Sequence, residues 1–333
     1  MGVMKIAYLG SGAWGFSLAR LLAGNGHEVV IWTIEKDLPD HFAKAKRHPR
    51  FPDIEVKGSF RYTFDIEEAL DGAELLVESV TSKGMRSVLE QLVKLGVELP
   101  PFVITSKGIE QGTGFLLPEL AREILGPKAK IACLSGPTLA LEVLHELPAS
   151  VVSASEDEEL MHTVGKAFTT STFRVYPNTD MIGVAFGGAM KNIIAIASGI
   201  SDGLGFGENT KAALMTRGLH EIRKMGAVKG AKMDTLNGLA GMGDLCATCI
   251  SDKSRNYQFG NLLAKGLTPD EARDKIGMVV EGAYTCVSAR ELGQKHEVAL
   301  PITEGVYQVV YKGLDPKKAV HALLTRTIKE ESL

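Results

Sequence analysis

Lys191 has the clearest capacity for chemistry in this sequence, because of the small and apolar residues around it. It lies in the run GGAMKNI, within an apolar stretch with helical spacing over residues 180–198. Small residues allow another backbone or a ligand to approach, and a lysine on such a buried surface loses hydration, which lowers its pKa. Lys191 is therefore a candidate proton donor or acceptor, and the alternative is a structural lysine that snorkels or forms an ion pair.

Two further segments of the second half carry chemical groups. The run GMGDL places Asp244 in a glycine-rich loop that we expect to be exposed, where it would orient a substrate or the lysine; loop capping is the alternative. In the run SRN, Ser254 is a good N-cap for a helix that begins at Arg255 and continues through Asn256. Free amides at a helix start together with a guanidinium form a phosphate site.

The N-terminal run GSGAWG, over residues 10–15, is typical of dinucleotide binding. An apolar strand pattern over residues 5–9 precedes it, a helical pattern over residues 16–23 follows, and a second strand pattern covers residues 28–32. In such a unit Gly10 makes the tight turn, Gly12 lets the backbone approach a pyrophosphate, and Gly15 permits close packing of helix and strand. The helix N-terminus then faces the phosphates.

The choice between NAD and NADP stays open, with NAD favoured. An acidic residue about twenty positions after the glycines selects the ribose hydroxyl of NAD, and Glu35 stands at that distance. Lys36 follows it at once, and Arg47 and Arg50 are close enough in sequence to reach the 2′-phosphate of NADP.

The elements that must position these groups predict an α/β fold, with an N-terminal Rossmann-type doubly wound sheet followed by an all-α C-terminal domain. Further strand patterns cover residues 74–80, 102–105, 130–134 and 172–177, with helical patterns at 85–95 and 116–125. Six helical patterns follow, over residues 180–198, 209–225, 255–265, 268–276, 283–295 and 302–311. We expect a dinucleotide-binding domain over residues 1–178 and a substrate-binding domain over residues 179–333.

Polar segments at residues 79–82, 106–108 and 135–138 follow the predicted strands. Ligands of open α/β sheets bind at the carboxyl ends of the strands. These segments should therefore line one crevice.

Composition excludes several classes of protein. The 333 residues are 45% hydrophobic, and 40 acidic against 37 basic residues leave a formal charge of -3 without a block of like charges, which argues against a nucleic-acid partner. No secretory signal pattern opens the sequence, so we expect a cytoplasmic protein. The apolar window over residues 182–200 has Lys191 and Asn192 at its centre, which favours a buried helix over a membrane span.

Four cysteines are too few and too scattered for a disulfide scaffold, which fits a reducing compartment. Cys246 and Cys249 form one C-x-x-C pair, for which a redox pair or half of a zinc site is the alternative to a plain structural role. No second pair or histidine cluster lies nearby, and we predict no metal site.

Taken together, these motifs resemble those of the NAD(P)-dependent sn-glycerol-3-phosphate dehydrogenase family of bacterial type, over essentially the entire chain. The shared runs are GSGAWG, SKGIEQGTG at 106–114, SGPT at 135–138, GGAMKNIIAIASGISDGLGFGENTKAAL at 187–214, GLAGMGDL at 238–245, SRN at 254–256, VVEG and PITE. The resemblance implies hydride transfer between NAD(P)H and dihydroxyacetone phosphate to give sn-glycerol 3-phosphate, a precursor for glycerophospholipid synthesis. It also suggests a homodimer.

The resemblance implies roles for individual residues. Lys191 would accept the proton in glycerol-phosphate oxidation and donate it in the reverse reaction, with Asp244 and Lys107 as catalytic partners. The implied substrate contacts are Lys107, Gly136, Thr138, Lys191, Asp244, Ser254, Arg255 and Asn256. The implied cofactor contacts are Gly10, Gly12, Ala13, Trp14, Gly15, Lys107, Ala140, Arg255, Val279 and Glu281, beside the Glu35 predicted above.

Two segments depart from the family pattern. Many relatives carry a basic residue or histidine after the tryptophan of the second strand, whereas Thr33 and Ile34 follow Trp32 here. A proline often seen after the fourth strand is replaced within residues 78–82. The first departure weakens any transfer of the family's usual NADP preference. Because of the second, contacts of the loop over residues 78–82 with the cofactor are not transferred from the family.

Two other functions compete with this interpretation. One is another Rossmann dehydrogenase with a helical C-terminal domain, acting on a hydroxy acid or sugar phosphate, against which the paired GGAMKN and SRN segments argue. The other is a redox-sensing protein that binds NAD(H) without turnover. Such a sensor needs no proton-transfer group, so the joint presence of Lys191, Lys107 and Asp244 argues against it.

Overall fold

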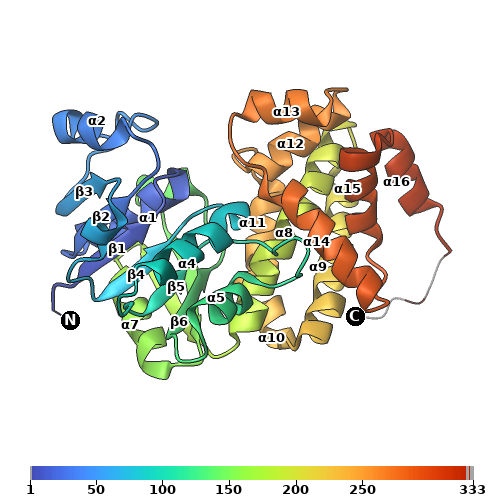
Figure 1. The fold of residues 1–333 in the computed structure, drawn as a ribbon. Helices are drawn as coiled ribbons and strands as arrows, with labels where there is room; N and C mark the ends of the chain where they lie inside the picture. The colour runs from blue at the N-terminus through green and yellow to red at the C-terminus, as the bar shows by residue number, and fades with distance from the viewer. Residues whose placement is uncertain (1, 328–329, 331–333) are drawn as a thin grey trace. The chain divides into compact units, whose positions relative to one another are not determined.

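The computed structural model describes residues 2–327 and 330. The chain divides into two compact units, which we name the sheet unit (Met1–Ser106 with Leu117–Met181) and the helical unit (Lys107–Leu116 with Ile182–Leu333). Figure 1 follows the chain from the strands of the first to the helices of the second. The short segment Lys107–Leu116 is grouped with the helical unit, although it lies early in the sequence.

The sheet unit is built on one eight-stranded sheet in the order β3-β2-β1-β4-β5-β6-β7-β8. Its strands are β1 (Lys5–Leu9), β2 (Glu28–Trp32), β3 (Ser59–Thr63), β4 (Leu75–Glu78), β5 (Phe102–Ile104), β6 (Ile131–Ser135), β7 (Ala149–Ser155) and β8 (Phe173–Asn178). All neighbouring strands are parallel except β6 and β7, which are antiparallel. This confirms the predicted Rossmann-type sheet.

Two strands escaped the sequence patterns for physical reasons. β3 (SFRYT) is an edge strand whose first three residues are not buried, so it lacks the apolar run of a central strand. β7 (ASVVSAS) is buried but rich in serine. The hydroxyl groups of Ser153 and Ser155 donate to the carbonyl oxygens of Met161 and Ile131, at 3.0 and 2.6 Å, which makes their burial tolerable.

Helices cover both faces of the central strands. Ile6 and Tyr8 alternate along β1 with Ala7 and Leu9, and all four are fully buried, as expected for a parallel strand between two helical layers. The helices of this unit are α1 (Ala13–Gly24), α2 (Leu38–Ala45), α3 (Ile66–Leu70), the 3₁₀ turn η1 (Ser82–Gly84), α4 (Met85–Lys94), α5 (Leu117–Leu125), α6 (Ala140–Leu144) and α7 (Glu158–Phe168). Figure 1 shows α4 and α5 side by side.

The helical unit contains α8 (Met181–Gly203), α9 (Glu208–Lys229), α10 (Met233–Asn237), the π-helical turn η2 (Leu239–Gly243), α11 (Asp244–Ile250), α12 (Arg255–Ala264), α13 (Pro269–Ile276), α14 (Glu281–Lys295), α15 (Pro301–Lys312) and α16 (Pro316–Leu324). All six predicted helices of this half are present. The sequence patterns missed α10, α11 and α16, which are short.

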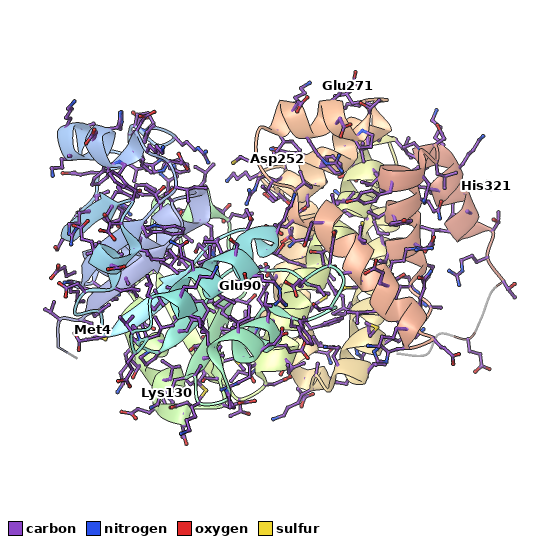
Figure 2. The ribbon with its side chains drawn as sticks, in the orientation of Figure 1. Met4, Glu90, Lys130, Asp252, Glu271 and His321 are labelled. Atoms are coloured by element: carbon purple, nitrogen blue, oxygen red, sulfur yellow. The ribbon has the colours of Figure 1, made fainter. Side chains whose placement is uncertain are left out.

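Each unit has a hydrophobic core of its own. The buried cluster of the sheet unit gathers around β1 and α1, and the cluster of the helical unit gathers around α8. Helix α8 is long and apolar enough to cross a membrane by length and composition, but 83% of its most apolar window is buried in the protein. It therefore acts here as a core helix. Charged side chains such as Glu90, Lys130 and Glu271 are exposed (Figure 2).

Candidate active site

The predicted glycine turn has the geometry that a dinucleotide requires. Gly10 has a φ of 104°, a conformation that favours glycine. A Cβ atom on Gly15 would lie 2.4 Å from the carbonyl oxygen of Gly10, so only glycine permits this packing of α1 on the turn. Gly12 precedes α1 in an extended conformation, and a Cβ atom there would meet nothing within 4 Å. The backbone thus leaves open space beside the start of α1.

The start of α1 is suited to a phosphate. No side chain caps it, and no acidic residue lies in its first turn. Its first amide groups therefore have no side-chain acceptor, and the helix dipole adds a partial positive charge. Trp14 follows in the first turn, and its indole nitrogen donates to the carbonyl oxygen of Thr105 at 3.2 Å. This arrangement suits the pyrophosphate of a dinucleotide, and the cofactor contacts expected of these residues stay predictions.

Glu35 lies beside this turn. The hydroxyl of Ser11, within the glycine turn, donates to a carboxylate oxygen of Glu35 at 3.2 Å, and Ser11 also bonds Thr33 at 2.6 Å. A guanidinium nitrogen of Arg50 lies 4.0 Å from the carboxylate of Glu35. By contrast, Arg47 donates to the carbonyl oxygen of Pro52 at 2.8 Å. An acid and a cation therefore flank the position where the ribose is expected, which suits both cofactors.

Three other predicted residues lie after β6 in the sheet unit. Gly136 has a φ of 155°, and a Cβ atom there would lie 2.8 Å from the Cα atom of Val151. The hydroxyl of Thr138 donates to the carbonyl oxygen of Gly136 at 3.1 Å, and Ala140 begins α6. They shape the segment at the carboxyl end of β6, and their predicted ligand contacts stay predictions.

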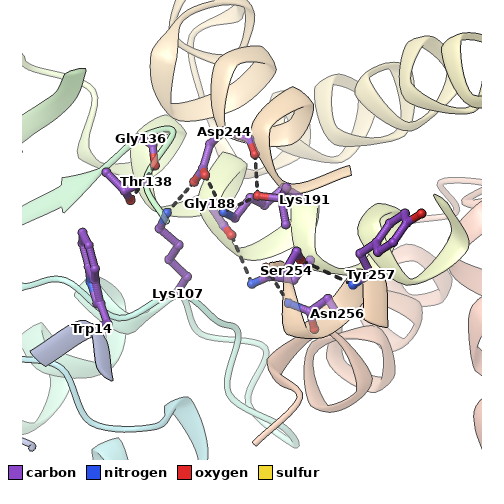
Figure 3. Close-up of polar contacts among 12 residues, drawn as sticks. Trp14, Lys107, Gly136, Thr138, Gly188, Lys191, Asp244, Ser254, Asn256 and Tyr257 are labelled. Atoms are coloured by element: carbon purple, nitrogen blue, oxygen red, sulfur yellow. Dashed lines mark hydrogen bonds and ion pairs between the residues drawn. The ribbon is translucent and has the colours of Figure 1, made fainter. Parts of the chain in front are cut away.

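In the helical unit, one buried carboxylate holds two lysines. The ammonium group of Lys191, on α8, donates to one oxygen of Asp244, and the ammonium of Lys107 lies 2.5 Å from the other (Figure 3). Lys191 also donates to the hydroxyl of Thr248 at 2.7 Å. Asp244 is fully buried and Lys191 is 5% exposed. The predicted catalytic trio is therefore assembled within one unit.

Burial lowers the pKa of Lys191 to about 8. The negative charge of Asp244 opposes this shift, and the positive charge of Lys107 adds to it. The loss of hydration was predicted from the sequence. A lysine with this pKa exchanges a proton readily near neutral pH, which suits a general acid or base.

The expected setting of Asp244 was wrong. The sequence predicted an exposed glycine-rich loop, whereas the preceding residues form the π-helical turn η2 and Asp244 begins α11, fully buried. The reason is close packing: a Cβ atom on Gly187, in α8, would lie 2.6 Å from the carbonyl oxygen of Ala240. The glycines admit the neighbouring turn rather than solvent, and this brings Asp244 against Lys191.

The predicted helix start at Ser254 is confirmed. Its hydroxyl accepts a hydrogen bond from the amide of Tyr257 at 3.3 Å, which caps α12. Arg255 occupies the first position of α12 and donates to the carbonyl oxygen of Val279 at 3.2 Å. Arg255 is therefore held next to the segment that precedes α14, which begins at Glu281. These residues lie close together, while their roles toward a ligand stay predictions.

Asn256 is buried and links two other elements. Its amide nitrogen donates to the side-chain oxygen of Asn192 at 2.9 Å, and its amide oxygen accepts from the backbone of Gly282 at 2.9 Å. Asn192 directly follows Lys191 on α8. The contact therefore ties the start of α12 to the helix of the lysine.

The sequence did not single out Thr248 or Asn192 as site residues. Thr248 lies one helical turn after Asp244, and this spacing of four residues on one helix was the available signal. Asn192 adjoins Lys191 in sequence, but only packing shows which side chain it meets. Thr248 and Asn192 complete the polar surroundings of Lys191 and Asn256.

The C-x-x-C pair takes no part in this cluster's hydrogen bonds. Cys133, Cys246, Cys249 and Cys286 are free thiols. The Sγ atom of Cys246 lies 3.8 Å from the sulfur of Met242, and burial raises the pKa of both Cys246 and Cys249. Among the described residues, no group of three or more metal-ligating side chains gathers.

Comparison with known proteins agrees with this geometry. Two family models match, described as the N-terminus and the C-terminus of NAD-dependent glycerol-3-phosphate dehydrogenase, over residues 5–161 and 180–321. A glycerol-3-phosphate dehydrogenase [NAD(P)+] of Protochlamydia amoebophila is 56% identical over 331 residues, covering 99% of each chain. That of Chlamydia muridarum is 55% identical, covering 98% of this chain and 99% of the relative.

A solved structure is also similar over nearly the whole chain. The crystal structure of glycerol-3-phosphate dehydrogenase from Coxiella burnetii matches with a TM-score of 0.94 and 38% sequence identity, covering 97% of this chain and 99% of that one. The fold is therefore shared over nearly the whole chain. The chain belongs to the NAD-dependent glycerol-3-phosphate dehydrogenase family.

Proposed function

We propose that this protein is an NAD(P)-dependent sn-glycerol-3-phosphate dehydrogenase, which reduces dihydroxyacetone phosphate and provides sn-glycerol 3-phosphate for glycerophospholipid synthesis. The observation that carries the proposal is the trio in which the buried carboxylate of Asp244 contacts the buried Lys191 and the partly buried Lys107. A protein that only senses NAD(H) has no use for a buried lysine whose pKa lies near 8. Membership of the family supports the identity of the substrate.

The glycine turn and Glu35 would hold the dinucleotide, whose nicotinamide, when bound, would supply or accept the hydride at the substrate carbon. Lys191 acts on the oxygen of that carbon. In reduction its ammonium group gives a proton to the carbonyl oxygen, which becomes the hydroxyl of glycerol 3-phosphate. In oxidation the neutral amine takes the hydroxyl proton.

Lys107 and Asp244 tune this proton transfer. The charge of Lys107 lowers the pKa of Lys191 and attracts the electron-rich oxygen of the substrate. Asp244 holds both ammonium groups in place. The trio bears one net positive charge when both lysines are protonated, which favours an anionic substrate.

Arg255 and the start of α12 provide the phosphate site. Ser254 caps the helix through its hydroxyl, and the guanidinium of Arg255 sits in the first turn. A helix start and a guanidinium each favour a phosphate dianion. Asn256 ties this helix start to α8 and so keeps the phosphate at a set distance from Lys191.

The test replaces Lys191. We expect Lys191→Ala to lower kcat by about 10²- to 10⁴-fold, the usual contribution of general acid–base catalysis. NADH binding, followed by its fluorescence, should stay within about twofold, because the glycine turn is unchanged. Substantial remaining turnover would refute the role of Lys191, and a wild-type protein without activity on dihydroxyacetone phosphate would refute the function.

The same assay decides the cofactor. NADH and NADPH are compared side by side with dihydroxyacetone phosphate and with alternative carbonyl substrates. Because Glu35 and Arg50 lie within 4.0 Å of each other, we expect activity with both cofactors. We also propose that the protein is cytoplasmic. We further propose that it forms a homodimer, which light scattering of the purified protein would test.

A further inference from the structure

The proposed phosphate site depends on the first turn of α12, and Tyr257 lies in that turn. Its amide donates to the hydroxyl of Ser254, which caps the helix (Figure 3). Its own hydroxyl donates to a carboxylate oxygen of Asp202 at 2.6 Å. Asp202 lies near the end of α8, the helix that carries Lys191. Tyr257 therefore ties the turn that holds Arg255 to the helix of the proposed proton donor.

A third side chain holds Asp202 in place. The ammonium group of Lys211, on α9, lies 2.8 Å from the same carboxylate oxygen that accepts from Tyr257. The side chains of Lys211 and Asp202 are 11% and 17% exposed, so water weakens this ion pair little. The hydrogen bond with Asp202 raises the pKa of Lys211, and a carboxylate oxygen of Glu208 lies 3.6 Å from its ammonium group. Three helices, α8, α9 and α12, thus meet at one oxygen atom.

The hydroxyl of Tyr257 remains a donor over the pH range of an enzyme assay. Burial raises the pKa of Tyr257 to about 12, and the hydrogen bond and negative charge of Asp202 add to this shift. A phenol hydroxyl has a single proton, and here that proton is donated to Asp202. The bond therefore depends on an acceptor at residue 202.

Glycines bring the backbones of α8 and α12 into direct contact. A Cβ atom on Gly199, in α8, would lie 1.9 Å from the carbonyl oxygen of Tyr257. A Cβ atom on Gly260, in α12, would lie 2.0 Å from the carbonyl oxygen of Ile196. Only glycine fits at both positions, so close packing fixes the distance between the helices. The rotation of α12 about its own axis is then fixed by hydrogen bonds, which are directional.

Two such bonds hold the turn that carries Arg255. Asn256 donates to the side chain of Asn192, in the middle of α8, at 2.9 Å. Tyr257 donates to Asp202, the last but one residue of α8. The first turn of α12 is therefore held at two separate points of one rigid core helix, and the guanidinium of Arg255 is carried by that turn.

We propose that Tyr257 and Asp202 are positioning residues for the substrate phosphate, because their hydrogen bond sets the orientation of the first α12 turn and thereby the place of the Arg255 guanidinium. This role rests on the proposed function, which assigns Arg255 to the phosphate. Tyr257 and Asp202 touch no reacting atom in this scheme. Their effect therefore falls on the binding of the substrate rather than on the transfer of the proton or the hydride.

The first test is Tyr257→Phe, which removes the hydroxyl and keeps the ring. We expect KM for dihydroxyacetone phosphate to rise about threefold to tenfold while kcat stays within about twofold, because only the phosphate anchor is displaced. Thr303→Val is the control, since it removes a buried hydroxyl that donates to Glu221 at 2.9 Å in the helical unit. It should lower the melting temperature and leave KM unchanged. A rise of KM in both variants, or in neither of them beside an active wild type, would overturn the proposal.

A double-mutant cycle with Arg255→Ala shows whether the effect passes through that arginine. In the Arg255→Ala background, Tyr257→Phe should change kcat/KM for dihydroxyacetone phosphate by less than about twofold. Independent losses that multiply would contradict positioning through Arg255. If the wild type is inactive, or if Arg255→Ala alone leaves KM unchanged, the proposed function or its phosphate site is refuted, and this role with it.

Substitutions of Asp202 provide the second test. Asp202→Ala removes the acceptor, whereas Asp202→Asn can place its amide oxygen where Tyr257 and Lys211 both contact a single carboxylate oxygen. We expect Asp202→Ala to raise KM for dihydroxyacetone phosphate about as much as Tyr257→Phe does. Asp202→Asn should keep KM within about twofold of the wild type. Equal KM values in the two Asp202 variants would contradict a role through this hydrogen bond.

Discussion

Lys191, Lys107 and Asp244 form a cluster with more positive than negative charge, in which Lys191 and Asp244 are buried and Lys107 is partly buried. A buried ammonium is costly unless a carboxylate and further acceptors compensate it, and here one carboxylate compensates two. Thr248 supplies a further acceptor for Lys191. The excess positive charge favours release of a proton, because loss of the proton from Lys191 makes the cluster neutral. Proton transfer to the substrate is thereby favoured.

The pH dependence of the rate follows from this cluster. Reduction needs the ammonium form of Lys191 and oxidation needs the amine, and its pKa lies at about 8. We expect kcat for dihydroxyacetone phosphate to fall as pH rises through about 8, and kcat for glycerol 3-phosphate to rise over the same range. Profiles of kcat between about pH 6 and pH 10 in both directions would measure this.

The Asp244→Asn substitution tests whether Lys191 is the group that titrates in these profiles. The carboxylate raises the pKa of Lys191, so its loss should move both limbs of the profiles to lower pH. We also expect a loss of kcat of about 10²-fold, because the amide holds the two lysines less firmly. A profile with an unshifted midpoint would contradict the assignment of the titrating group to Lys191.

At the scale of elements, the proposed ligand sites depend on two helix starts and on the packing of α8 against the turn before Asp244. α1 begins after a glycine without a side-chain cap, while α12 begins after a serine that caps it. An uncapped start leaves its amides for a bulky pyrophosphate, whereas a capped start with an arginine suits a single phosphate. In α8, Gly187 allows the turn before Asp244 to pack closely against the helix.

The start of α12 permits a matched comparison of caps. Ser254 caps α12 and Thr268 caps α13. Each hydroxyl oxygen accepts a hydrogen bond from a backbone amide at 3.3 Å. Replacement of either by alanine should cost about 1 kcal/mol in the free energy of unfolding. Only Ser254→Ala should also raise KM for dihydroxyacetone phosphate, severalfold. Equal KM values in the two variants would contradict a phosphate site at α12.

The glycine turn predicts opposite outcomes at two positions. A methyl group on Gly12 meets open space, so Gly12→Ala should keep the melting temperature and raise KM for NADH at least about tenfold by filling the space of the pyrophosphate. Gly15→Ala should lower the melting temperature, since its Cβ atom would lie 2.4 Å from the oxygen of Gly10. Gly165→Ala, within α7 and open to space, is the control for both.

At the scale of the whole molecule, the chain has two compact units with separate hydrophobic cores. We propose that they are separate folding domains, with the segment Lys107–Leu116 carried by the helical one. Phe168 and Phe259 are fully buried, one in each core. They offer a direct comparison of the two units.

Phe168→Leu and Phe259→Leu should each cost about 1–3 kcal/mol. Hydrogen exchange followed by mass spectrometry should show faster exchange only in the unit that carries the substitution, because local opening follows cooperative units. Acceleration in both units from either substitution would mean one cooperative domain. The exchange of residues 107–116 should follow Phe259→Leu.

The sequence alone determined the local structure and the chemical inventory of this protein. The glycine turn between strand and helix, the cap at Ser254 and the long apolar helix around Lys191 depend on residues close in the chain, whose spacing obeys local rules. The family motifs identified the reaction. Short elements such as β7 and α11 lacked this signal, because their serines, threonine and cysteines are stabilised by partners distant in sequence or by burial.

Only the tertiary structure decided which groups meet. Asp244 looked like an exposed loop residue, but the packing of α8 against the turn after residue 238 buries it against two lysines that lie 53 and 137 positions away. Nothing in the sequence singled out Glu78, whose carboxylate accepts hydrogen bonds from amides that follow both β4 and β5. Such contacts join residues distant in sequence, and no local pattern encodes the charge and burial that they create.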